Sequence, residues 1–276
     1  MKKLILIIFA ACLLTSCQSD SDTVKTNPNA LQRVDFYPKS PNETRWNFNK
    51  KGFLTSITDS NGDTLESFAY DAKNNVIQNT KYSQGTPIEN LNIIYDSDNY
   101  IKSINNKIYN YSHEDNRYFY DSNNETFSCK VNSDGLATLY FSSITNTNPA
   151  ENLFLSYTFE YENGNLISIE KNGTVVNPIE IDFNYGLITN PLKSGLLPVF
   201  RLKSLTEPQF LEHGFTSNNL KEGQNYLDAS QKSQTFGMLF YNTNKLELIT
   251  EEDYYHGVYN SGRTNSYYYY QGDVIP

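Results

Sequence analysis

The chain is poor in cysteine, which excludes a fold held together by disulfides. Three cysteines occur in 276 residues. Cys12 and Cys17 lie in or directly after an apolar N-terminal run, and Cys129 is alone in the rest of the chain. A lone thiol gains no internal disulfide even in an oxidising compartment. The stability of the fold is therefore expected to come from burial of apolar and aromatic side chains.

Basic residues are also few. The 22 Lys and Arg residues stand against 31 Asp and Glu residues, so the formal net charge is −9, and no basic run occurs. Nucleic-acid binding needs clustered Lys and Arg side chains to neutralise phosphates. The composition therefore argues against a nucleic-acid partner.

Motifs for metals, cofactors and catalysis are scarce as well. The histidines are His113, His213 and His256. None has a second His or Cys three to five residues away, so no zinc motif is present. The acidic stretches 59–63 and 96–99 do not complete a calcium-binding loop, and no Gly-x-Ser-x-Gly motif occurs. We predict no catalytic residues, no metal ligands and no cofactor.

Aromatic residues, in contrast, are abundant. The chain has 22 Tyr and 16 Phe residues against one Trp. Tyr, Phe, Thr and Ile favour strands, whereas the plentiful Asn, Asp, Ser and Gly favour turns. No long window shows apolar residues at helical spacing. The composition therefore predicts an all-β protein.

The N-terminus has the parts of an export signal in the expected order. Two lysines precede an apolar run over residues 4–14, which is about half of the roughly twenty residues needed to span a bilayer. The run closes with Leu14-Thr15-Ser16-Cys17, which resembles the lipobox of bacterial lipoproteins. This resemblance implies that residues 1–16 are a signal peptide. It also implies that Cys17 carries the acyl chains, palmitate among them, that anchor the protein to a membrane.

A polar segment follows the predicted anchor. Residues 17–30 are rich in Ser, Asp, Thr and Asn, which is typical of a flexible tether. Acidic residues directly after a lipidated cysteine resemble the surface-export signal of Bacteroidota lipoproteins. The resemblance implies an outer-membrane protein that faces the cell surface. A linker that faces the periplasm is the alternative.

A degenerate unit recurs along the chain. It consists of an aromatic residue, Asp or Asn, one or two polar residues, Gly or Asn, and then an aliphatic residue. The copies start at Phe48, Tyr70, Tyr95, Tyr120, Tyr161 and Tyr241, so the first four are 22, 25 and 25 residues apart. Asp and Asn initiate turns through their side chains, and Gly and Asn accept left-handed backbone angles. Each copy therefore predicts a β-hairpin.

The repeats carry a family resemblance. They resemble the YD-type repeats of bacterial cell-surface proteins. Their arrangement behind a lipobox is similar to a family of Bacteroidota lipoproteins of unknown function with a porin-like β fold. Phe183-Asn184-Tyr185-Gly186, followed by the Asn190-Pro191 step, also resembles that family. The resemblance covers about residues 45–250, implies an antiparallel β fold, and supplies no catalytic residues to carry over.

These patterns together predict one all-β domain over residues 31–276. We expect an antiparallel meander of repeated hairpins, with about 14 to 18 strands that form a strongly curved sheet or barrel and little helix. Prolines interrupt the pattern near 190–224. We interpret this stretch as an irregular excursion over one end of the sheet, with a short helix within residues 202–213.

The Tyr-rich C-terminal hairpin is the predicted ligand-binding face, because exposed Tyr rings bind sugars and peptides well. The candidate ligand-binding residues are Tyr254, Tyr255, Tyr259, Tyr267 and Tyr269. Packing in the core and cross-strand ladders are the alternative role for these rings. The expected function is a lipid-anchored, non-catalytic binding or interaction module for a glycan or a protein. A glycosidase-like hydrolase and a structural envelope component are the alternatives.

Overall fold

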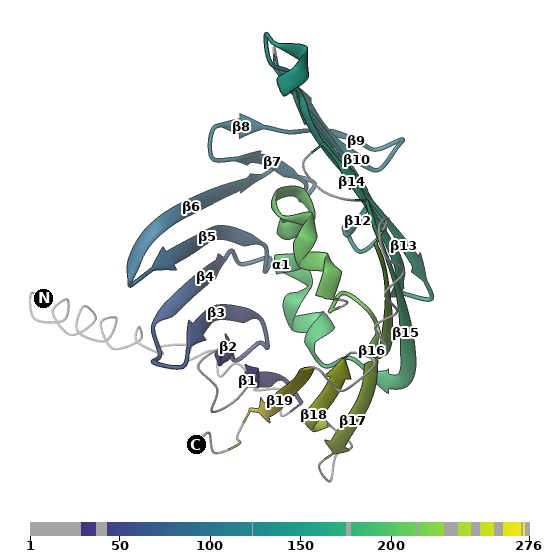
Figure 1. Cartoon of the computed structure of the whole chain (residues 1–276). Coiled ribbons are helices and arrows are strands. Elements are labelled where there is room, and N and C mark those ends of the chain that lie inside the picture. The colour runs from purple at the N-terminus through teal and green to yellow at the C-terminus, as the bar shows by residue number, and fades with distance from the viewer. Residues whose placement is uncertain are drawn as a thin grey trace, which may run out of the picture.

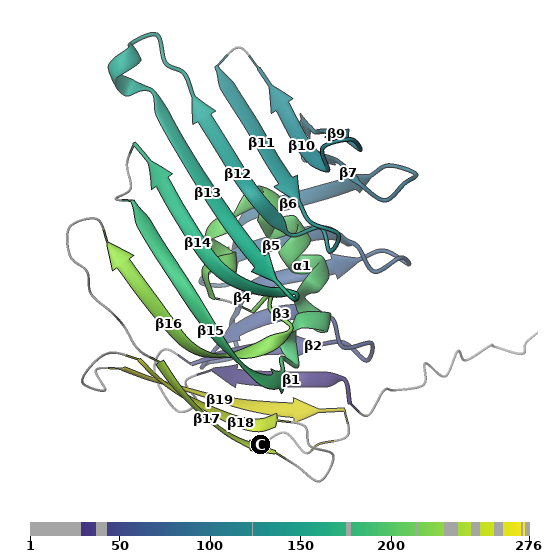
Figure 2. The same ribbon diagram turned by 90° about the vertical axis from the view of Figure 1, so that its right-hand side faces the viewer.

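Two antiparallel sheets face each other across a central helix in the computed structural model of the chain (Figure 1, Figure 2). The structure describes residues 29–36, 43–122, 124–174, 178–213, 215–228, 237–243, 249–256, 262–271 and 273. The predicted signal peptide, Cys17 and nearly all of the predicted tether lie outside these residues. The all-β class predicted from composition is confirmed, since strands form most of the described chain.

The first sheet has eleven strands in the order β17-β18-β19-β1-β2-β3-β4-β5-β6-β7-β8. Their bounds are Leu31–Phe36 (β1), Thr44–Phe48 (β2), Leu54–Asp59 (β3), Thr64–Tyr70 (β4), Val76–Ser83 (β5), Thr86–Tyr95 (β6), Ile101–Ile104 (β7), Lys107–Ile108 (β8), Gly237–Thr243 (β17), Ile249–His256 (β18) and Gly262–Tyr270 (β19). The last strand, β19, pairs antiparallel with the first, β1. The two ends of the described chain are therefore joined within one sheet.

The second sheet has eight strands in the order β16-β15-β14-β13-β12-β11-β10-β9. Their bounds are Asn110–Ser112 (β9), Arg117–Asp121 (β10), Glu125–Val131 (β11), Ala137–Ile144 (β12), Leu153–Glu162 (β13), Asn165–Gly173 (β14), Ile179–Thr189 (β15) and Asn219–Asp228 (β16). Within the described residues, the ladder of strand pairs is interrupted between β8 and β9 and between β16 and β17. The meander is thus divided into two curved sheets.

Side chains of the repeat build the turns. Asp96 Oδ1 accepts the N–H groups of Asp98 and Tyr100 at 3.0 and 2.8 Å, and Asn49 and Asp71 accept turn N–H groups in the same way. The left-handed position is filled by Gly52, Asn74 and Asn99, with φ angles of 86°, 67° and 74°. These oxygens are satisfied by the backbone of their own turns. Among the described residues, no three His, Cys, Asp or Glu side chains come together as a metal site would require.

In the second and third copies, the aromatic residue of the repeat ties its hairpin to the preceding one. The Tyr95 hydroxyl donates to the carbonyl of Val76 at 3.0 Å, and the Tyr70 hydroxyl donates to the carbonyl of Leu54. Leu54 and Val76 each open the return strand of the preceding copy and are fully buried. Burial raises the pKa of both tyrosines, so both phenols remain donors at neutral pH. The spacing of the repeat therefore places one hydroxyl beside one buried carbonyl.

The regular order of hairpins breaks at residues 107–112, where one crossing of the chain begins in the first sheet and ends in the second. β8 pairs with β7 of the first sheet, while β9, two residues further along the same pass, pairs with β10 of the second. We call this crossing, residues 107–112, the seam. The chain therefore crosses the sheets three times between the third repeat turn and the fourth. It crosses them only twice between the first turn and the second, and twice between the second and the third. As a result, the fourth turn lies at the opposite edge of the sheets from the first three.

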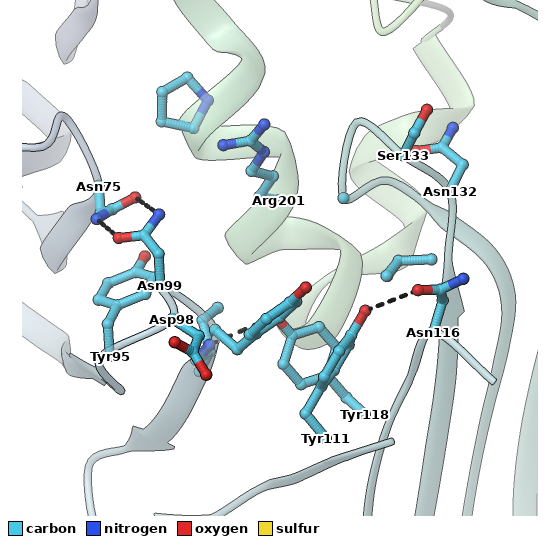
Figure 3. Close-up of a pocket in the computed structure, with 15 residues that line it drawn as sticks. Asn75, Tyr95, Asp98, Asn99, Tyr111, Asn116, Tyr118, Asn132, Ser133 and Arg201 are labelled. Atoms are coloured by element: carbon cyan, nitrogen blue, oxygen red, sulfur yellow. Dashed lines mark hydrogen bonds between the residues drawn. The ribbon is translucent and has the colours of Figure 1, made fainter. Parts of the chain in front are cut away.

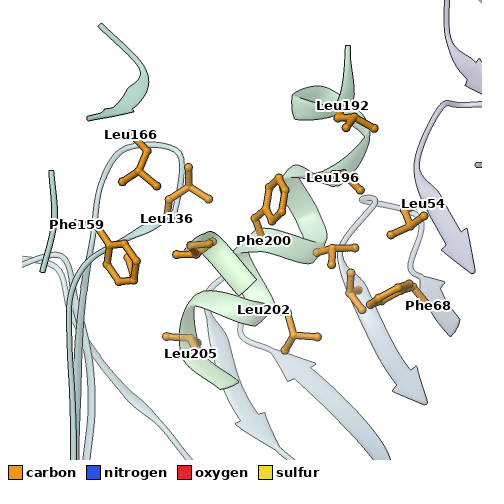
Figure 4. Close-up of a cluster of buried hydrophobic side chains, with 14 of the residues drawn as sticks. Leu54, Phe68, Leu136, Phe159, Leu166, Leu192, Leu196, Phe200, Leu202 and Leu205 are labelled. Carbon is orange, nitrogen blue, oxygen red and sulfur yellow. The ribbon is translucent and has the colours of Figure 1, made fainter. Parts of the chain in front are cut away.

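The space between the sheets is filled by α1 (Leu192–Thr206), which is followed by a short 3-10 helix, η2 (Pro208–His213); a second short 3-10 helix, η1 (Pro149–Glu151), lies between β12 and β13. Apolar side chains from α1 point toward both sheets (Figure 4). Its buried residues are Leu192, Gly195, Leu196, Val199, Phe200, Leu202, Lys203, Ser204 and Leu205. No described helix is long and apolar enough to cross a membrane.

This helix corrects the expectation for residues 190–224. The stretch is neither irregular nor laid over one end of a sheet. The predicted helix within 202–213 begins ten residues too late, since α1 starts at Leu192. Sequence periodicity misses α1 because Gly195 and Pro198 are poor helix formers and the polar Lys203 and Ser204 are buried, so the apolar residues form no clean stripe. A start signal is nevertheless present, because Asn190 Oδ1 accepts the N–H of Leu192 at 3.0 Å and a proline lies between them.

A buried charge network fastens α1 to the first sheet. The Lys203 ammonium group is fully buried and donates to Glu66 at 2.5 Å and to Glu207 at 2.7 Å. Lys81 bridges Glu207 and Glu89 at 2.9 Å each. Buried charges are tolerated when they are paired and hydrogen-bonded. The network therefore links β4, β5 and β6 to the end of the helix.

Glu207 makes the stability of the protein depend on acid pH. Burial alone would raise its pKa, but the charge of Lys203 and hydrogen bonds from Lys203 and Lys81 outweigh burial, so the pKa lies below its usual value. A carboxyl group with a lower pKa in the folded state contributes stability that is complete above the unfolded pKa of about 4.3 and is lost as pH falls through the folded pKa. We expect the free energy of unfolding to fall below about pH 4, and to fall less steeply in Glu207→Gln. Urea unfolding of both proteins across this range measures the difference, and identical slopes would contradict it.

Candidate functional site

The seam opens a pocket at the edge of the sheets that carries the first three repeat turns. The cavity has a volume of about 280 Å³, near the lower end of the roughly 300–1,000 Å³ typical of ligand pockets. It exists because β7 and β9 diverge where the chain changes sheets. The turns at 96–99, 113–116 and 132–136 surround it, and Pro198 and Arg201 of α1 form its inner wall (Figure 3). Residues far apart in the chain therefore meet here.

Stacked tyrosines line one side of the pocket. The rings of Tyr100 and Tyr111 stack with centroids 3.9 Å apart, and Tyr118 lies 4.7 Å from Tyr111. His113 meets both stacked rings edge-on at 5.0 and 5.1 Å. Tyr100 and Tyr111 are half-buried, whereas Tyr118 is buried. The stack is thus a rigid aromatic surface with its outer part open to solvent.

Amide groups line the opposite side. The side chains of Asn75 and Asn99 exchange two hydrogen bonds, of 2.6 and 3.1 Å. They belong to the second and third repeat turns, so the turns of successive hairpins are directly linked. Asn116 accepts a hydrogen bond from the Tyr111 hydroxyl at 3.2 Å, and Asn132 lies on the far side of the pocket (Figure 3). The pocket therefore offers both amide donors and amide acceptors around its aromatic side.

One cation and one anion complete the lining. Arg201 Nε donates to the backbone carbonyl of Asp134 at 2.7 Å. A Cβ atom built on Gly135 would lie 3.1 Å from Arg201 Cγ and Nε, so the absence of a side chain lets the arginine lie closely across this turn. Asp98 is exposed, and it forms no ion pair with Arg201. The two groups therefore present opposite charges to the same cavity.

The pocket lining offers aromatic rings and hydrogen-bonding groups. Burial, reinforced by Tyr100, raises the pKa of Tyr111 to about 12, and burial raises the pKa of Tyr118 further. Both phenols therefore stay protonated at neutral pH. Asp98 is the single carboxylate among the lining residues. Ring stacking and hydrogen bonding are the interactions that this arrangement supplies.

A second cavity of about 500 Å³ lies at the other end of the seam, where β8 diverges from β10. Lys107 Nζ lies 2.7 Å from both the Tyr120 hydroxyl and Glu125 Oε1. The hydrogen bonds from Lys107 and Tyr120 hold the pKa of Glu125 below its usual value. Glu207, which also lines this cavity, has a lowered pKa as well. Glu89, the third carboxylate of the lining, pairs with Lys81 at 2.9 Å, so each of the three carboxylates has a lysine partner.

The Tyr-rich C-terminal hairpin is only partly described. In β19, Tyr268 and Tyr270 are each 3% exposed, while Tyr267 and Tyr269 are half-buried on the other face. The guanidinium carbon of Arg33 lies 5.8 Å from the centroid of the Tyr269 ring. Two of the five candidate rings thus lie on an accessible face, beside a charged group.

The remaining candidates cannot be placed at the level of side chains. Tyr254 and Tyr255 belong to β18, where they pair in register with Thr264 and Arg263. Their side chains lie outside the described residues, as do Tyr259 and the whole of Cys17. The proposed binding role of these tyrosines therefore stays a prediction.

The sequence did not predict the seam pocket, although it shows a high content of tyrosine. Tyr100 and Tyr111 lie opposite each other in the hairpin of β7 with β8, because the register of Ser103 with Ile108 continues through the hydrogen bond from the Tyr109 N–H to the Lys102 carbonyl. The tertiary structure adds Asn132 and Arg201 to their surroundings. The spacing of the repeat contains no signal of the break, since the third and fourth copies are 25 residues apart like the second and third. The third copy, at Tyr95, is the last of the first three at this edge, and the row of linked turns ends at Asn99.

Comparisons with known proteins give a distant likeness. No family model and no curated protein matches the chain. Among solved structures, a porin-like protein from Bacteroides uniformis ATCC 8492 is 11% identical with a TM-score of 0.37, covering 89% of this chain and 98% of that one. A porin-like protein from Bacteroides vulgatus ATCC 8482 is 10% identical with a TM-score of 0.40, covering 88% and 99%. Likenesses at these TM-scores decide neither family nor function.

Proposed function

We propose that this chain is a lipid-anchored envelope protein that binds a glycan in the seam pocket without transforming it. The observation that carries the proposal is the Tyr100–Tyr111 stack beside a ring of amides. Sugar rings present apolar C–H faces and many hydroxyls, so they are bound by aromatic faces and by groups that both donate and accept hydrogen bonds. The pocket volume suits one or two sugar rings.

A hydrolase is less well supported. Hydrolysis of a glycosidic bond uses two carboxyl groups about 5 to 9 Å apart, one of them with a raised pKa. The seam pocket is lined by one carboxylate, Asp98. In the second cavity, Glu89, Glu125 and Glu207 are each paired with a lysine. We therefore favour binding over catalysis for both cavities.

Anchoring of the protein rests on the sequence around Cys17. We expect Cys17→Ala to abolish labelling with radioactive palmitate and to release the protein from the membrane fraction, because one apolar segment of eleven residues (4–14) is too short to hold it. Membrane fractionation and intact mass measure both effects. A Cys129→Ala variant is the control, since Cys129 is fully buried. Wild-type membrane association of Cys17→Ala would refute the anchor. Protease treatment of whole cells distinguishes the cell surface from the periplasmic face.

The binding site is tested on the full chain with a glycan array, followed by titration of the best ligand. We expect Tyr100→Ala and Tyr111→Ala each to weaken binding about tenfold, a loss of about 1.4 kcal/mol, as expected for an aromatic anchor at the centre of a site. Tyr267→Ala is the matched control, because it removes an equally half-buried ring outside the pocket.

The outcomes separate the two candidate sites. Loss of binding in the pocket variants alone supports the seam pocket. Loss in Tyr267→Ala and Tyr269→Ala alone transfers the site to the C-terminal hairpin. A wild-type protein that binds no glycan on the array would overturn the proposed function, and the role of a protein-binding or structural envelope component would then be favoured.

A further inference from the structure

We infer that the seam pocket selects a sugar that carries a carboxylate, a hexuronate, and that Arg201 binds this carboxylate. The inference rests on the proposed glycan binding and specifies its substrate class. Arg201 is the single cationic group among the residues that line the pocket. Its position opposite the tyrosine stack defines where a charged substituent of a stacked sugar ring would lie.

Arg201 is oriented before any ligand arrives. Its Nε–H is bonded to the Asp134 carbonyl at 2.7 Å, and its side chain lies against Gly135. The two terminal nitrogens form no hydrogen bond or ion pair with any residue that the structure describes. A guanidinium group with both terminal nitrogens available matches the two oxygens of a carboxylate. Because the arginine is already held, little side-chain entropy is lost on binding.

The neighbouring acidic groups do not neutralise Arg201. The Asp134 carboxylate pairs with Lys193 at 3.1 Å, so its charge is already balanced. Asp98 lines the same pocket and forms no ion pair with Arg201; both side chains are exposed, so water and salt screen the charge of each. The lining thus supplies one cation, which can pair with one carboxylate of an acidic sugar. The same guanidinium group also binds phosphate and sulfate oxygens, so a sulfated disaccharide is included below as the competing ligand.

The remaining surroundings suit the rest of the sugar. The Tyr100–Tyr111 stack offers a flat face for the ring, and the Asn99 and Asn132 amides lie on either side of Arg201 (Figure 3). Neutral amides bond hydroxyls without discriminating charge. The selectivity for an acid is therefore assigned to Arg201 and the ring affinity to the tyrosines, so the two contributions are separable.

The experiment compares ligands that differ only in charge. The full chain is titrated with di-galacturonate and with its methyl ester, which keeps the ring and removes the charge. We expect wild type to bind the acid at least tenfold more tightly than the ester, and we expect this preference to weaken with added salt. Arg201→Gln should bring acid binding down to the level of the ester. Arg201→Lys should retain part of the preference, because lysine keeps the positive charge but lacks the planar guanidinium group that pairs with both carboxylate oxygens.

Two further variants serve as controls. Lys102→Gln removes one positive charge from β7 next to the pocket, but Lys102 is exposed and does not line the cavity, so the preference should be unchanged. Asp98→Asn removes the opposing anion and should tighten acid binding two- to threefold without changing ester binding. Circular dichroism and urea midpoints confirm that each variant is folded.

The results distinguish failure of this inference from failure of the proposed function. Equal binding of acid and ester, or a preference unchanged in Arg201→Gln, overturns the inference while glycan binding stands. Tighter binding of a sulfated disaccharide than of di-galacturonate also overturns it. Absence of binding to every glycan, neutral or acidic, overturns the proposed function together with the inference.

Discussion

Replacing Lys203 with methionine is expected to lower the free energy of unfolding by about 3–5 kcal/mol, the cost of removing one partner from a buried ion pair. Methionine nearly preserves the volume, so the loss reports charge and not a cavity. Without the ammonium group, Glu66 is left hydrogen-bonded to Asn79 and Glu207 is left to Lys81. The side chains of Glu66 and Glu207 are only 12% and 21% exposed, so water replaces Lys203 poorly.

Lys193→Met is the matched control, because Lys193 lies on the same helix. It pairs with Asp134, whose side chain is 42% exposed, and an ion pair of this kind contributes about 0–1 kcal/mol. Urea unfolding measures both variants. The triple variant Lys203→Met, Glu66→Gln, Glu207→Gln should recover much of the loss, since it removes the uncompensated charges. Equal effects of Lys203→Met and Lys193→Met would show that the buried network does not hold the helix in place.

Gly195→Ala is expected to destabilise the protein by about 1–3 kcal/mol, the usual cost of overpacking a core. In an exposed helix interior the same change stabilises by about 0.5–1 kcal/mol, so the sign itself is diagnostic. A Cβ atom at position 195 would lie 2.3 Å from the carbonyl oxygen of Gly52 and 3.2 Å from the Phe48 ring. The helix or the first repeat turn would have to shift.

Ser194→Ala provides the control, because Ser194 is exposed one residue away on the same helix. Its effect should lie within about 0.5 kcal/mol of zero, as for surface sites. Urea midpoints at constant m-value measure both changes. A Gly195→Ala variant as stable as wild type would mean that α1 does not approach the turn closely.

Local chemistry explains the parts of the fold that could be predicted. Turns such as those at Asn49, Asp71 and Asp96 are closed by hydrogen bonds within five residues, so their sequence signal does not depend on the rest of the chain. The same holds for the strand preference of Tyr and Phe. The class of the fold and the positions of the early hairpins were therefore accessible from residues alone.

The helix and the pocket were not accessible in this way. α1 contains Gly195 and Pro198 and buries the polar Lys203 and Ser204 between the sheets, so its sequence lacks the regular amphipathic pattern of a surface helix. Its position depends on contacts such as Lys203 with Glu66, which are 137 residues apart in the chain.

What the sequence by itself determined is the hairpin unit and the strand-rich class, because both follow from interactions among near neighbours. Only the tertiary structure decided where the ladder of strands breaks. Residues 107 and 108 pair with the first sheet, and residues 110–112 pair with the second. Tyr100, Tyr111 and Arg201 line the cavity at this divergence. Both sheets offer a free edge to this one segment, so its pairing depends on the two whole sheets. No local pattern records its outcome.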